Sequence, residues 1–407
     1  MKYSKIKSID NQIGTPFYIM HPDRYEENVK AFLSTFQRRY DKVIAGYSFK
    51  TNYVPQLCMR AKQLGCYAEV VSKMEYELAV KLGFEKIIFN GPIKTDDCLT
   101  DAINRGAIIN LDSEYEIDSI CEYKAKHPEK DVKVGIRINV KLINEDGQSA
   151  IQSGLRMGRF GFPYDILKKN ISQLRFQGVK IVSLHGHTSS SDRAVNNYKF
   201  ISEQMLRVCE EYKLDQLEYF DVGGGFWGAP PEGVDTTNKP TYQAYADSIL
   251  DVLLNSKWFC ERRPRIVIEP GCSVVTNVFD YVTKVYQNKQ IVDVHFVTVD
   301  GSVFDVKPTL HANNLIFEPI RKESSDDMIV ADVVGSTCME KDVILKNVSM
   351  PAVEKGDYLL MKGVGAYTIC LTPTFINYLS PIVSLNGECL NIARRRQTLD
   401  DVLSIYQ

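Results

Sequence analysis

The stretch Ala45-Gly-Tyr-Ser-Phe-Lys-Thr-Asn52 ends an apolar segment with a single lysine that turn-forming residues follow. This pattern predicts a buried strand with Lys50 at its end. A partly desolvated lysine favours the neutral amine, which is a nucleophile toward carbonyl groups. Because a strand-end lysine can also be an ordinary solvated group, the interpretation depends on the rest of the chain.

A regular alternation of strand and helix patterns extends outward from this stretch. The predicted strands end near Phe49, Ser72, Asn90, Asp112, Asn139, His187, Val222 and Glu269. Between most of them lie amphipathic stretches such as 73–82 and 115–124, whose apolar residues recur every three or four positions. Eight strands alternating with helices predict a parallel (β/α)8 TIM-like barrel, in which the loops after the strands build the active site.

The pattern changes after about residue 275. Short β-rich pieces separated by turns are expected at 281–286, 291–299, 328–334, 358–362 and 382–385. They predict a second, antiparallel β-barrel or sandwich domain, completed by an N-terminal strand at 16–20. The expected domains are therefore a cofactor-binding barrel over 24–275 and a β domain formed by 1–23 plus 276–407.

Composition limits the classes of function. The 407 residues carry a formal net charge of −2 and are 44% hydrophobic, which gives no field suited to nucleic acid or an anionic membrane. No stretch approaches the roughly 20 apolar residues of a membrane span, and the ten cysteines form no CxxC pair. We expect a cytoplasmic protein with reduced thiols and a small-molecule partner.

Three glycines close the seventh predicted strand in Asp221-Val-Gly-Gly-Gly-Phe226. Glycines let backbone N–H groups approach a phosphate closely, although a triple glycine also suits an ordinary turn. The loop after the seventh strand of a barrel is the usual phosphate position of this fold. We therefore interpret Gly223, Gly224 and Gly225 as phosphate ligands.

The segment Ser183-Leu-His-Gly-His-Thr-Ser-Ser-Ser191 places His185 and His187 on the same face of a strand, because side chains alternate with period two. Two such histidines could bind a metal, but a catalytic zinc needs a third protein ligand and none is evident in the sequence. We predict no metal. We expect His187 to stack on a planar cofactor ring and Ser190 to donate to its phosphate, whereas His185 also fits an ordinary core position.

Glu269 follows an apolar strand directly, in Ile266-Val-Ile-Glu-Pro-Gly-Cys272. Burial disfavours a carboxylate charge unless a cation lies beside it, although a Glu-Pro-Gly turn can also be purely structural. A protonated pyridine nitrogen is such a cation. With Lys50 available for an aldehyde, Glu269 and the neighbouring Gly271 predict pyridoxal 5'-phosphate as cofactor, its ring acting as an electron sink.

Nine motifs occur in an order and at spacings that are specific to one family. They are Gly14-Thr-Pro-Phe-Tyr-Ile, Tyr47-Ser-Phe-Lys-Thr-Asn, Ala68-Glu-Val-Val-Ser-Lys-Met-Glu-Tyr-Glu-Leu, Gly158-Arg-Phe-Gly, His185-Gly-His, Gly223-Gly-Gly, Glu269-Pro-Gly, Cys338 and Gly365-Ala-Tyr. With them the whole chain resembles the fold-type III pyridoxal-phosphate decarboxylases, the diaminopimelate, ornithine and carboxynorspermidine decarboxylase family. The resemblance implies an alanine-racemase-like barrel plus a β domain.

The resemblance also assigns roles to residues. It implies that Lys50 is the Schiff-base lysine, that His187 stacks on the ring and that Glu269 holds the pyridine nitrogen. The cofactor-binding set that it implies is Lys50, His187, Ser190, Gly223, Gly224, Gly225, Glu269, Gly271 and Tyr367. The active site of the family lies at a homodimer interface, where the neighbouring subunit supplies the cysteine that matches Cys338, and Asp342 is expected to pair with Arg159 across that interface.

The reaction implied by the family is an amino-acid decarboxylation. The substrate amine displaces Lys50 from the cofactor, the α-carboxylate leaves as carbon dioxide, and Cys338 or a nearby acid protonates the carbanion. Lys50 then releases the amine product. Catalytic residues are therefore expected to be Lys50, Cys338, His187 and Glu269.

Three positions depart from the diaminopimelate decarboxylase pattern. The family's arginine after Glu-Pro-Gly, which contacts phosphate or substrate, is replaced by Cys272. The family's acid after the active-site cysteine is replaced by Met339. The family's arginine and tyrosine that bind a distal carboxylate are replaced by Lys307 and His311. An unpaired buried ammonium beside Met339 would cost on the order of several kcal/mol. We therefore predict a modified or conjugated amino acid with a distal carboxylate, unless Glu340 replaces the missing acid.

Three alternatives stay open. The first is a genuine meso-diaminopimelate decarboxylase of lysine biosynthesis. The second is an amino-acid racemase, which would need a second base and usually pairs the pyridine with arginine instead of a carboxylate. The third is an inactive regulatory homologue, which would be expected to have lost cofactor ligands.

Overall fold

The computed structural model describes residues 1–144, 146–323, 326–387 and 389–406. The chain forms two compact units: unit 1 contains residues 1–25, 229–236 and 274–407, and unit 2 contains residues 26–228 and 237–273. The expected domain limits assigned 229–236 to the barrel, whereas this loop belongs to unit 1. The limits 24–275 and 1–23 plus 276–407 stay a proposal.

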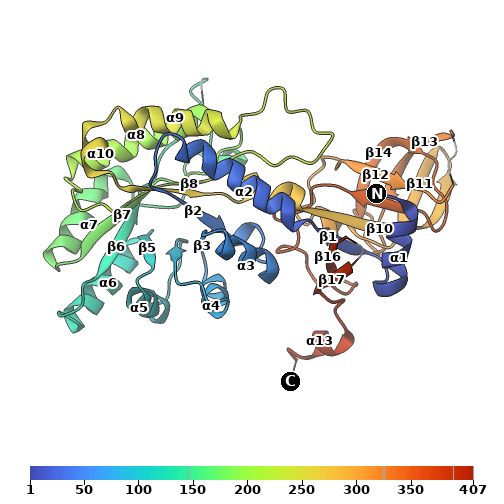
Figure 1. The fold of residues 1–407 in the computed structure, drawn as a ribbon, viewed down its shortest axis with the longest axis horizontal. Helices are drawn as coiled ribbons and strands as arrows, with labels where there is room; N and C mark the ends of the chain where they lie inside the picture. Colours follow the sequence, from blue (N-terminus) through green and yellow to red (C-terminus); the bar gives the residue numbers. More distant parts are fainter. Residues whose placement is uncertain (145, 324–325, 388, 407) are drawn as a thin grey trace. The chain divides into compact units, whose positions relative to one another are not determined.

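Unit 2 is built on a closed barrel of eight parallel strands, β2 to β9, paired in sequence order (Figure 1). The strands are β2 (Val43–Ser48), β3 (Tyr67–Val70), β4 (Ile87–Phe89), β5 (Ile108–Leu111), β6 (Lys133–Arg137), β7 (Lys180–His185), β8 (Tyr219–Gly224) and β9 (Arg265–Glu269). Ile44 on β2 pairs with Val267 on β9, which closes the ring. The predicted barrel is confirmed.

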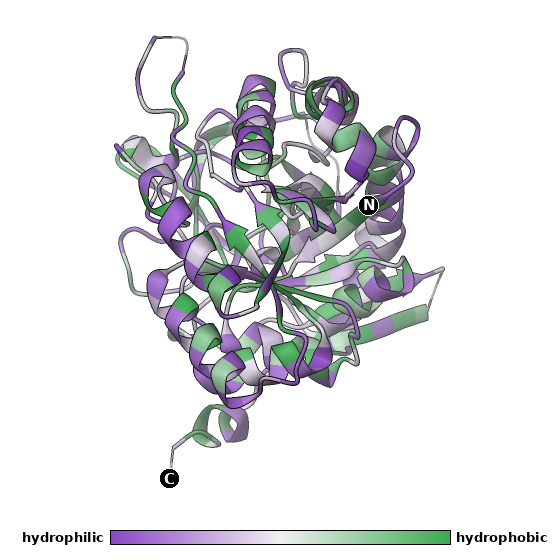
Figure 2. Ribbon diagram, turned by 90° about the vertical axis from the view of Figure 1, so that its left-hand side faces the viewer, coloured by the Kyte–Doolittle hydropathy of each residue, from purple (hydrophilic) through white to green (hydrophobic). Residues whose placement is uncertain are grey.

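Helices surround the strands of unit 2 (Figure 1). They are α3 (Pro55–Gln63), α4 (Lys73–Lys81), α5 (Asp96–Arg105), α6 (Glu114–Lys126), α7 (Tyr164–Phe176), α8 (Val195–Glu211), α9 (Tyr242–Leu254) and α10 (Lys257–Arg262), with α2 (Pro22–Gln37) before β2. Local signals set their ends: Ser113 and Glu116 form a capping box on α6, and left-handed Gly106 ends α5. Hydrophilic and hydrophobic residues alternate along these helices (Figure 2), as expected of helices with one buried face.

The barrel interior has an apolar layer near the start of the strands and a polar layer above it. The apolar layer consists of Ile44, Ile88, Ile108 and Val267, with Tyr67 and Tyr219 packed against it. The polar layer has room because of Gly135, whose added Cβ would lie 2.0 Å from Asn110 Oδ1. The small Gly135 leaves space for the polar side chain of Asn110 in this layer. The layer lies toward the carboxyl ends of the strands, where a TIM barrel has its active site.

Unit 1 contains a nine-stranded sheet with the order β14-β13-β11-β10-β1-β16-β17, in which β15 also pairs with β10 and β12 pairs with β15. The strands are β1 (Phe17–Met20), β10 (Phe279–Ile291), β11 (Val294–Val299), β12 (Phe317–Ile320), β13 (Met328–Val334), β14 (Val343–Pro351), β15 (Tyr358–Met361), β16 (Ile382–Asn386) and β17 (Cys389–Arg394). The β1–β16 and β11–β13 pairs are parallel. The second β domain is confirmed, but its sheet is mixed rather than antiparallel.

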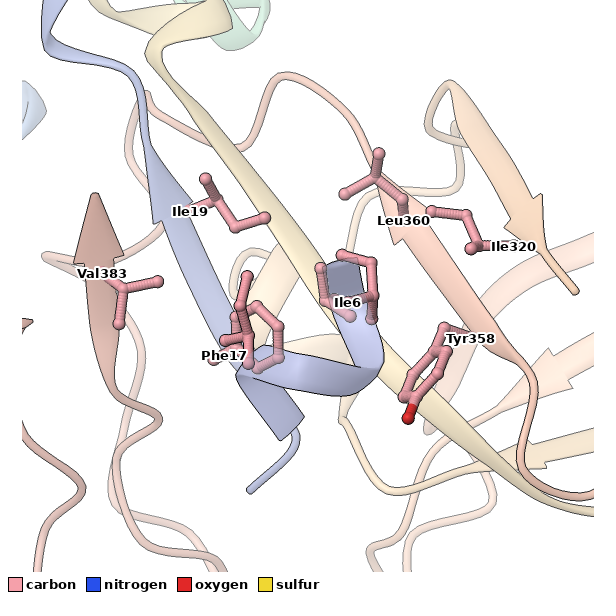
Figure 3. Packing of buried hydrophobic residues seen from close by; sticks show 9 residues of the cluster. Ile6, Phe17, Ile19, Ile320, Tyr358, Leu360 and Val383 are labelled. Atoms are coloured by element: carbon pink, nitrogen blue, oxygen red, sulfur yellow. The ribbon is translucent and has the colours of Figure 1, made fainter. Parts of the chain in front are cut away.

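A hydrophobic cluster joins both ends of the chain in unit 1. Figure 3 shows Ile6, Phe17, Tyr358, Leu360 and Val383 pointing toward one another. Helix α1 (Tyr3–Ile13), which the sequence did not predict, buries Ile6 and Ile9 in this cluster. Burial of such side chains stabilises a fold by roughly 1.5–3 kcal/mol each, so the packing explains why this short polar segment is helical.

The remaining elements are short. They are α11 (Cys272–Val275), α12 (Val303–Val306), α13 (Leu399–Leu403), η1 (Phe49–Thr51), η2 (Gln152–Gly154) and η3 (Thr276–Val278). None of the ten cysteines, all of which lie in the described part of the chain, forms a disulfide. Among the described residues, no helix combines the length and the apolar character that crossing a bilayer requires.

Candidate active site

Lys50 lies on η1, directly after β2, and its amine contacts a buried carboxylate. Its Nζ is 2.5 Å from Oε2 of Glu69 on β3, and the Ser48 hydroxyl donates to the same oxygen at 2.5 Å. The Glu69 side chain is fully buried, whereas 31% of the Lys50 side chain is exposed. The geometry holds the Lys50 amine at the edge of the barrel interior, with a carboxylate within reach of its protons.

Amide side chains extend this contact across the barrel. The Asn90 amide donates to Glu69 Oε1 at 3.0 Å and to Glu269 Oε1 at 2.6 Å. Asn110 in turn donates to Asn90 Oδ1 at 2.8 Å and accepts from Ser183 at 2.8 Å. The predicted residues Lys50 and Glu269 are therefore brought together through two side chains that the sequence did not single out.

Glu269 lies in a small group of buried titratable residues. Its Oε2 is 3.6 Å from His185 Nε2, and ligand atoms of His185, Asp221 and Glu269 all lie within 4.8 Å of one another. Burial, reinforced by the Glu269 charge, raises the pKa of Asp221 well above its usual value and favours its protonated form. The sequence suggested no third donor near the histidines, but the structure places two carboxyl groups beside His185.

His185 ends β7 and His187 lies in the loop just after it, so the two do not share a strand as predicted, although their rings lie close together. Their rings are parallel within 9°, with centroids 6.2 Å apart. Burial, followed by the charge of Arg137, lowers the pKa of each imidazole well below its usual value. Arg137 also donates to the His187 carbonyl at 3.0 Å, so this arginine fixes the backbone that presents a neutral His187.

The glycines after β8 pack directly against this segment. Gly224 donates its N–H to His187 Nδ1 at 3.0 Å. An added Cβ on Gly223 would lie 2.3 Å from the His187 Cβ, and one on Gly224 would lie 2.4 Å from the Glu269 carbonyl oxygen. Larger residues are excluded here because two backbones and an imidazole meet.

The other predicted barrel residues lie on neighbouring loops. Ser190, in the loop after β7, accepts the Arg193 N–H at 3.0 Å. Gly271 follows β9, and its added Cβ would lie 2.3 Å from Thr51 Oγ1, next to Lys50 in the chain. Exposed Arg159 stacks on Phe160, with its guanidinium carbon 4.2 Å from the ring centroid.

The remaining predicted residues lie in unit 1. Cys338, Met339 and Glu340 form the turn between β13 and β14, where Met339 is half-buried and its two neighbours are exposed. Asp342 is buried and accepts four hydrogen bonds, from Ser302 Oγ, Val303 N, Thr337 N and Thr337 Oγ1. These bonds fix the turn. The expected pairing of Asp342 with Arg159 across a dimer stays a prediction.

Lys307 and His311 flank a turn after α12. Lys307 is only 4% exposed, and its Nζ contacts the Asn313 carbonyl at 3.4 Å. Burial lowers the pKa of Lys307, and burial together with the Lys307 charge lowers the pKa of exposed His311. Tyr367 has a left-handed backbone (φ 51°) and a 40% exposed side chain.

A second lysine–carboxylate pair occurs later in the barrel and differs from the first in its surroundings. Lys94 Nζ is 2.9 Å from Glu116 Oε1, and both side chains are fully buried. Glu116 also accepts N–H groups of Asp112 and Ser113, and Asp112 pairs with Arg137 at 3.1 Å. These contacts join the loops after β4 and β5.

Glu69, Asn90, Asn110 and Asp221 are the site residues that the sequence reasoning missed. Each stands within or directly after an apolar strand segment, and a polar residue in such a place is a signal for a functional interior. The motif Ala68-Glu-Val was noted only as part of a resemblance. Its carboxylate accepts a hydrogen bond from the Lys50 amine.

Comparison with known proteins gives consistent results. Residues 26–276 match the family described as "Pyridoxal-dependent decarboxylase, pyridoxal binding domain". A diaminopimelate decarboxylase of Aquifex aeolicus is 27% identical over 98% of this chain and 93% of its own length. A diaminopimelate decarboxylase of Methanocaldococcus jannaschii is 27% identical over 97% of this chain and 91% of its own length. The solved structure of the M. jannaschii decarboxylase with L-lysine covers 98% of this chain and 94% of its own, with 25% identity and a TM-score of 0.87.

Proposed function

The chain belongs to the family of pyridoxal-dependent decarboxylases, and on this premise we propose that it releases the α-carboxylate of meso-diaminopimelate as carbon dioxide. The observation that carries the proposal is that relatives with the name diaminopimelate decarboxylase align with nearly the whole chain, including the β domain. The chain is a pyridoxal-phosphate-dependent amino-acid decarboxylase, a carboxy-lyase. The substrate and the residue roles are the proposed parts.

The barrel residues fit pyridoxal phosphate at two points. Lys50 offers an amine for the aldehyde carbon, and buried Glu269 offers a carboxylate for the ring nitrogen. The phosphate is assigned to the glycine loop after β8, although the N–H groups of Gly223 and Gly224 donate to Asp221 and His187. The half-buried His187 offers a flat neutral ring for stacking. When bound, pyridoxal phosphate supplies an electron-withdrawing ring that stabilises the electron pair left by the departing carboxylate.

Two carboxylates then act on protons at opposite ends of one hydrogen-bonded chain. Glu69 Oε2, 2.5 Å from Lys50 Nζ, takes the proton that the amine must lose before it can act as a nucleophile. Glu269 keeps a proton on the ring nitrogen. Asn90 donates to both carboxylates and so fixes their orientation.

The β domain supplies the remaining groups in this proposal. We assign Cys338 as the acid that protonates the carbanion and Tyr367 as a phosphate ligand. A homodimer in which the neighbouring subunit provides the cysteine accounts for the exposure of Cys338 in one chain. The proposal expects Cys338→Ala to lower decarboxylation while the cofactor stays bound.

Lys307 and His311 are the proposed partners of the distal carboxylate. Lys307 is a buried amine, and among the described residues no carboxylate forms an ion pair with it. An anionic substrate group would compensate its charge. The distal amine of meso-diaminopimelate requires an acid as well, and Glu340 takes that role in place of Met339.

Met339 supports a second candidate substrate. The sequence led us to expect a modified or conjugated amino acid, because a thioether cannot compensate a buried ammonium. The names of the relatives favour diaminopimelate instead. The conjugated substrate is kept as the alternative because half-buried Met339, and not exposed Glu340, follows the cysteine directly.

A panel of substrates tests the proposal. Carbon dioxide release is measured with meso-diaminopimelate, ornithine, lysine, arginine and conjugated diamino acids, and the Lys50→Ala protein serves as the blank. Fastest turnover on meso-diaminopimelate with lysine as product supports the proposal. Fastest turnover on a conjugate would replace it by the second candidate, and inversion of an amino acid without carbon dioxide release would indicate a racemase.

A further inference from the structure

Arg193 is the one guanidinium that the loop after β7 brings to the carboxyl end of β9. Its Nη2 lies 4.0 Å from the Cys272 thiol, three residues after Glu269. Both Arg193 and Lys50 favour the ionised form of this thiol electrostatically, but burial is the largest influence and raises the pKa of Cys272. The thiol is therefore neutral, and it does not compensate the arginine charge.

The backbone of Arg193 is held on both sides. Its N–H donates to Ser190 Oγ at 3.0 Å, and its carbonyl accepts from the Tyr245 hydroxyl at 2.6 Å. Its φ of 52° lies in the left-handed region, which a non-glycine residue adopts only where its surroundings require it. The side chain therefore starts from a fixed position and not from a freely moving loop.

The charge of Arg193 has no counter-ion among the described residues. Within the described part of the chain, no carboxylate forms an ion pair with it. The adjacent Asp192 directs Oδ1 to the Ala194 N–H and the Asn197 amide. A half-buried guanidinium without a carboxylate is costly unless an anion binds there.

The neighbours of Arg193 indicate which anion that is. Ser190 and the glycines after β8 surround the same end of the barrel, where the fold binds phosphate. Tyr198 donates to the Gly224 carbonyl at 3.0 Å. Burial raises the pKa of Tyr198, and the nearby Arg193 charge opposes that rise. Arginine is suited to phosphate because its N–H groups can donate two parallel hydrogen bonds.

We propose that Arg193 binds the phosphate of the cofactor in this chain and supplies the positive charge that Cys272 lacks. The family pattern has an arginine at position 272, in the turn after β9. In this chain the arginine is residue 193, in the loop after β7, and we infer that it contacts the same phosphate. This inference rests on the phosphate site proposed above.

Affinity measurements on the full-length protein freed of cofactor test the inference. Dissociation constants are compared for pyridoxal phosphate and for pyridoxal, which lacks the phosphate, in wild type, Arg193→Met and Arg193→Lys. We expect Arg193→Met to bind pyridoxal phosphate on the order of 10- to 100-fold more weakly, with unchanged affinity for pyridoxal and an intermediate value for Arg193→Lys. The matched control is Arg38→Met at an exposed position, which should change neither constant.

Other outcomes separate the two proposals. Equal losses for both ligands, or no loss for either, in Arg193→Met would overturn the role of Arg193. A wild type that does not prefer pyridoxal phosphate over pyridoxal would overturn the phosphate site itself. The double variant Arg193→Met with Cys272→Arg tests whether residues 193 and 272 lie at the same phosphate. Recovery of at least tenfold in affinity for pyridoxal phosphate, about 1.4 kcal/mol, supports the inference. No recovery would overturn it.

Discussion

Two lysine–glutamate pairs in the same barrel have different surroundings. Lys94 and Glu116 are both fully buried, and the Lys94 amine also donates to the Gly91 carbonyl at 2.9 Å. Lys50 contacts an equally buried glutamate, Glu69, but 31% of its own side chain is exposed. The comparison teaches that burial of the amine, and not the type of ion pair, decides whether a lysine can reach a ligand.

The consequences of the two pairs follow from this difference. Glu116 accepts two backbone N–H groups at the start of α6 and ties Lys94 to the loops after β4 and β5, so the Lys94 pair stabilises the barrel. Burial also lowers the pKa of Lys94, but no bound molecule can approach a fully enclosed amine. The Lys50 amine is partly exposed and can be reached by a ligand, as its proposed role requires.

The largest expected effect is that of Lys50→Ala. We expect decarboxylation to fall by on the order of 1000-fold or more, because the amine proposed to bond to the cofactor is lost. Borohydride trapping of pyridoxal on the protein, followed by peptide mass analysis, measures the bond directly. A trapped adduct that persists in Lys50→Ala would disprove the assignment, whereas Lys94→Met should trap normally.

The next effect is on stability. Lys94→Met leaves the Glu116 charge buried without its cation, and we expect the free energy of unfolding to fall by about 3–5 kcal/mol. Urea unfolding followed by circular dichroism measures it. The double variant Lys94→Met with Glu116→Gln should recover part of the loss, and an unchanged urea midpoint in the single variant would contradict a structural role.

Glu75 sharpens the comparison by its pH dependence. Burial, together with the Glu69 charge and against the opposing Lys50 charge, raises the pKa of Glu75 to about 7. While Glu75 is protonated, its burial costs little free energy. As pH rises through about 7, the buried carboxyl ionises and the free energy of unfolding of the wild type falls. Relative to wild type, Glu75→Gln should therefore gain roughly 2–3 kcal/mol in unfolding free energy between about pH 5 and about pH 8. A difference that is constant over this range would mean that Glu75 has an ordinary pKa.

The smallest effect is expected for Glu69→Gln. The amide keeps the shape of the side chain but cannot take a proton from Lys50, so kcat/KM should fall by about tenfold. The exposed Glu77 on α4 provides the matched control, Glu77→Gln, which should be unchanged. Equal rates for Glu69→Gln and wild type would remove Glu69 from the proposed proton transfer.

The fold was predictable where periodicity is regular. The eight barrel strands end within two residues of their predicted ends, because strand and helix patterns alternate without interruption. Strand β14 was missed, and left-handed Asn347 (φ 52°) interrupts the alternation on which such a prediction depends. Helix α1 was missed because its stability comes from packing of Ile6 and Ile9 in a cluster that includes strands more than 250 residues away.

The sequence by itself determined the order of the elements and which residues stand at strand ends, and therefore the cofactor. Parallel strands in a closed barrel bring all carboxyl ends to one face, so Lys50, His187 and Glu269 could be grouped without coordinates. Only the tertiary structure decided which side chains touch: Asn90 with Glu269 across 179 residues, and Arg193 with Cys272 across 79. The physical reason is that strand register and loop conformation, not distance along the chain, set the layer that each side chain enters.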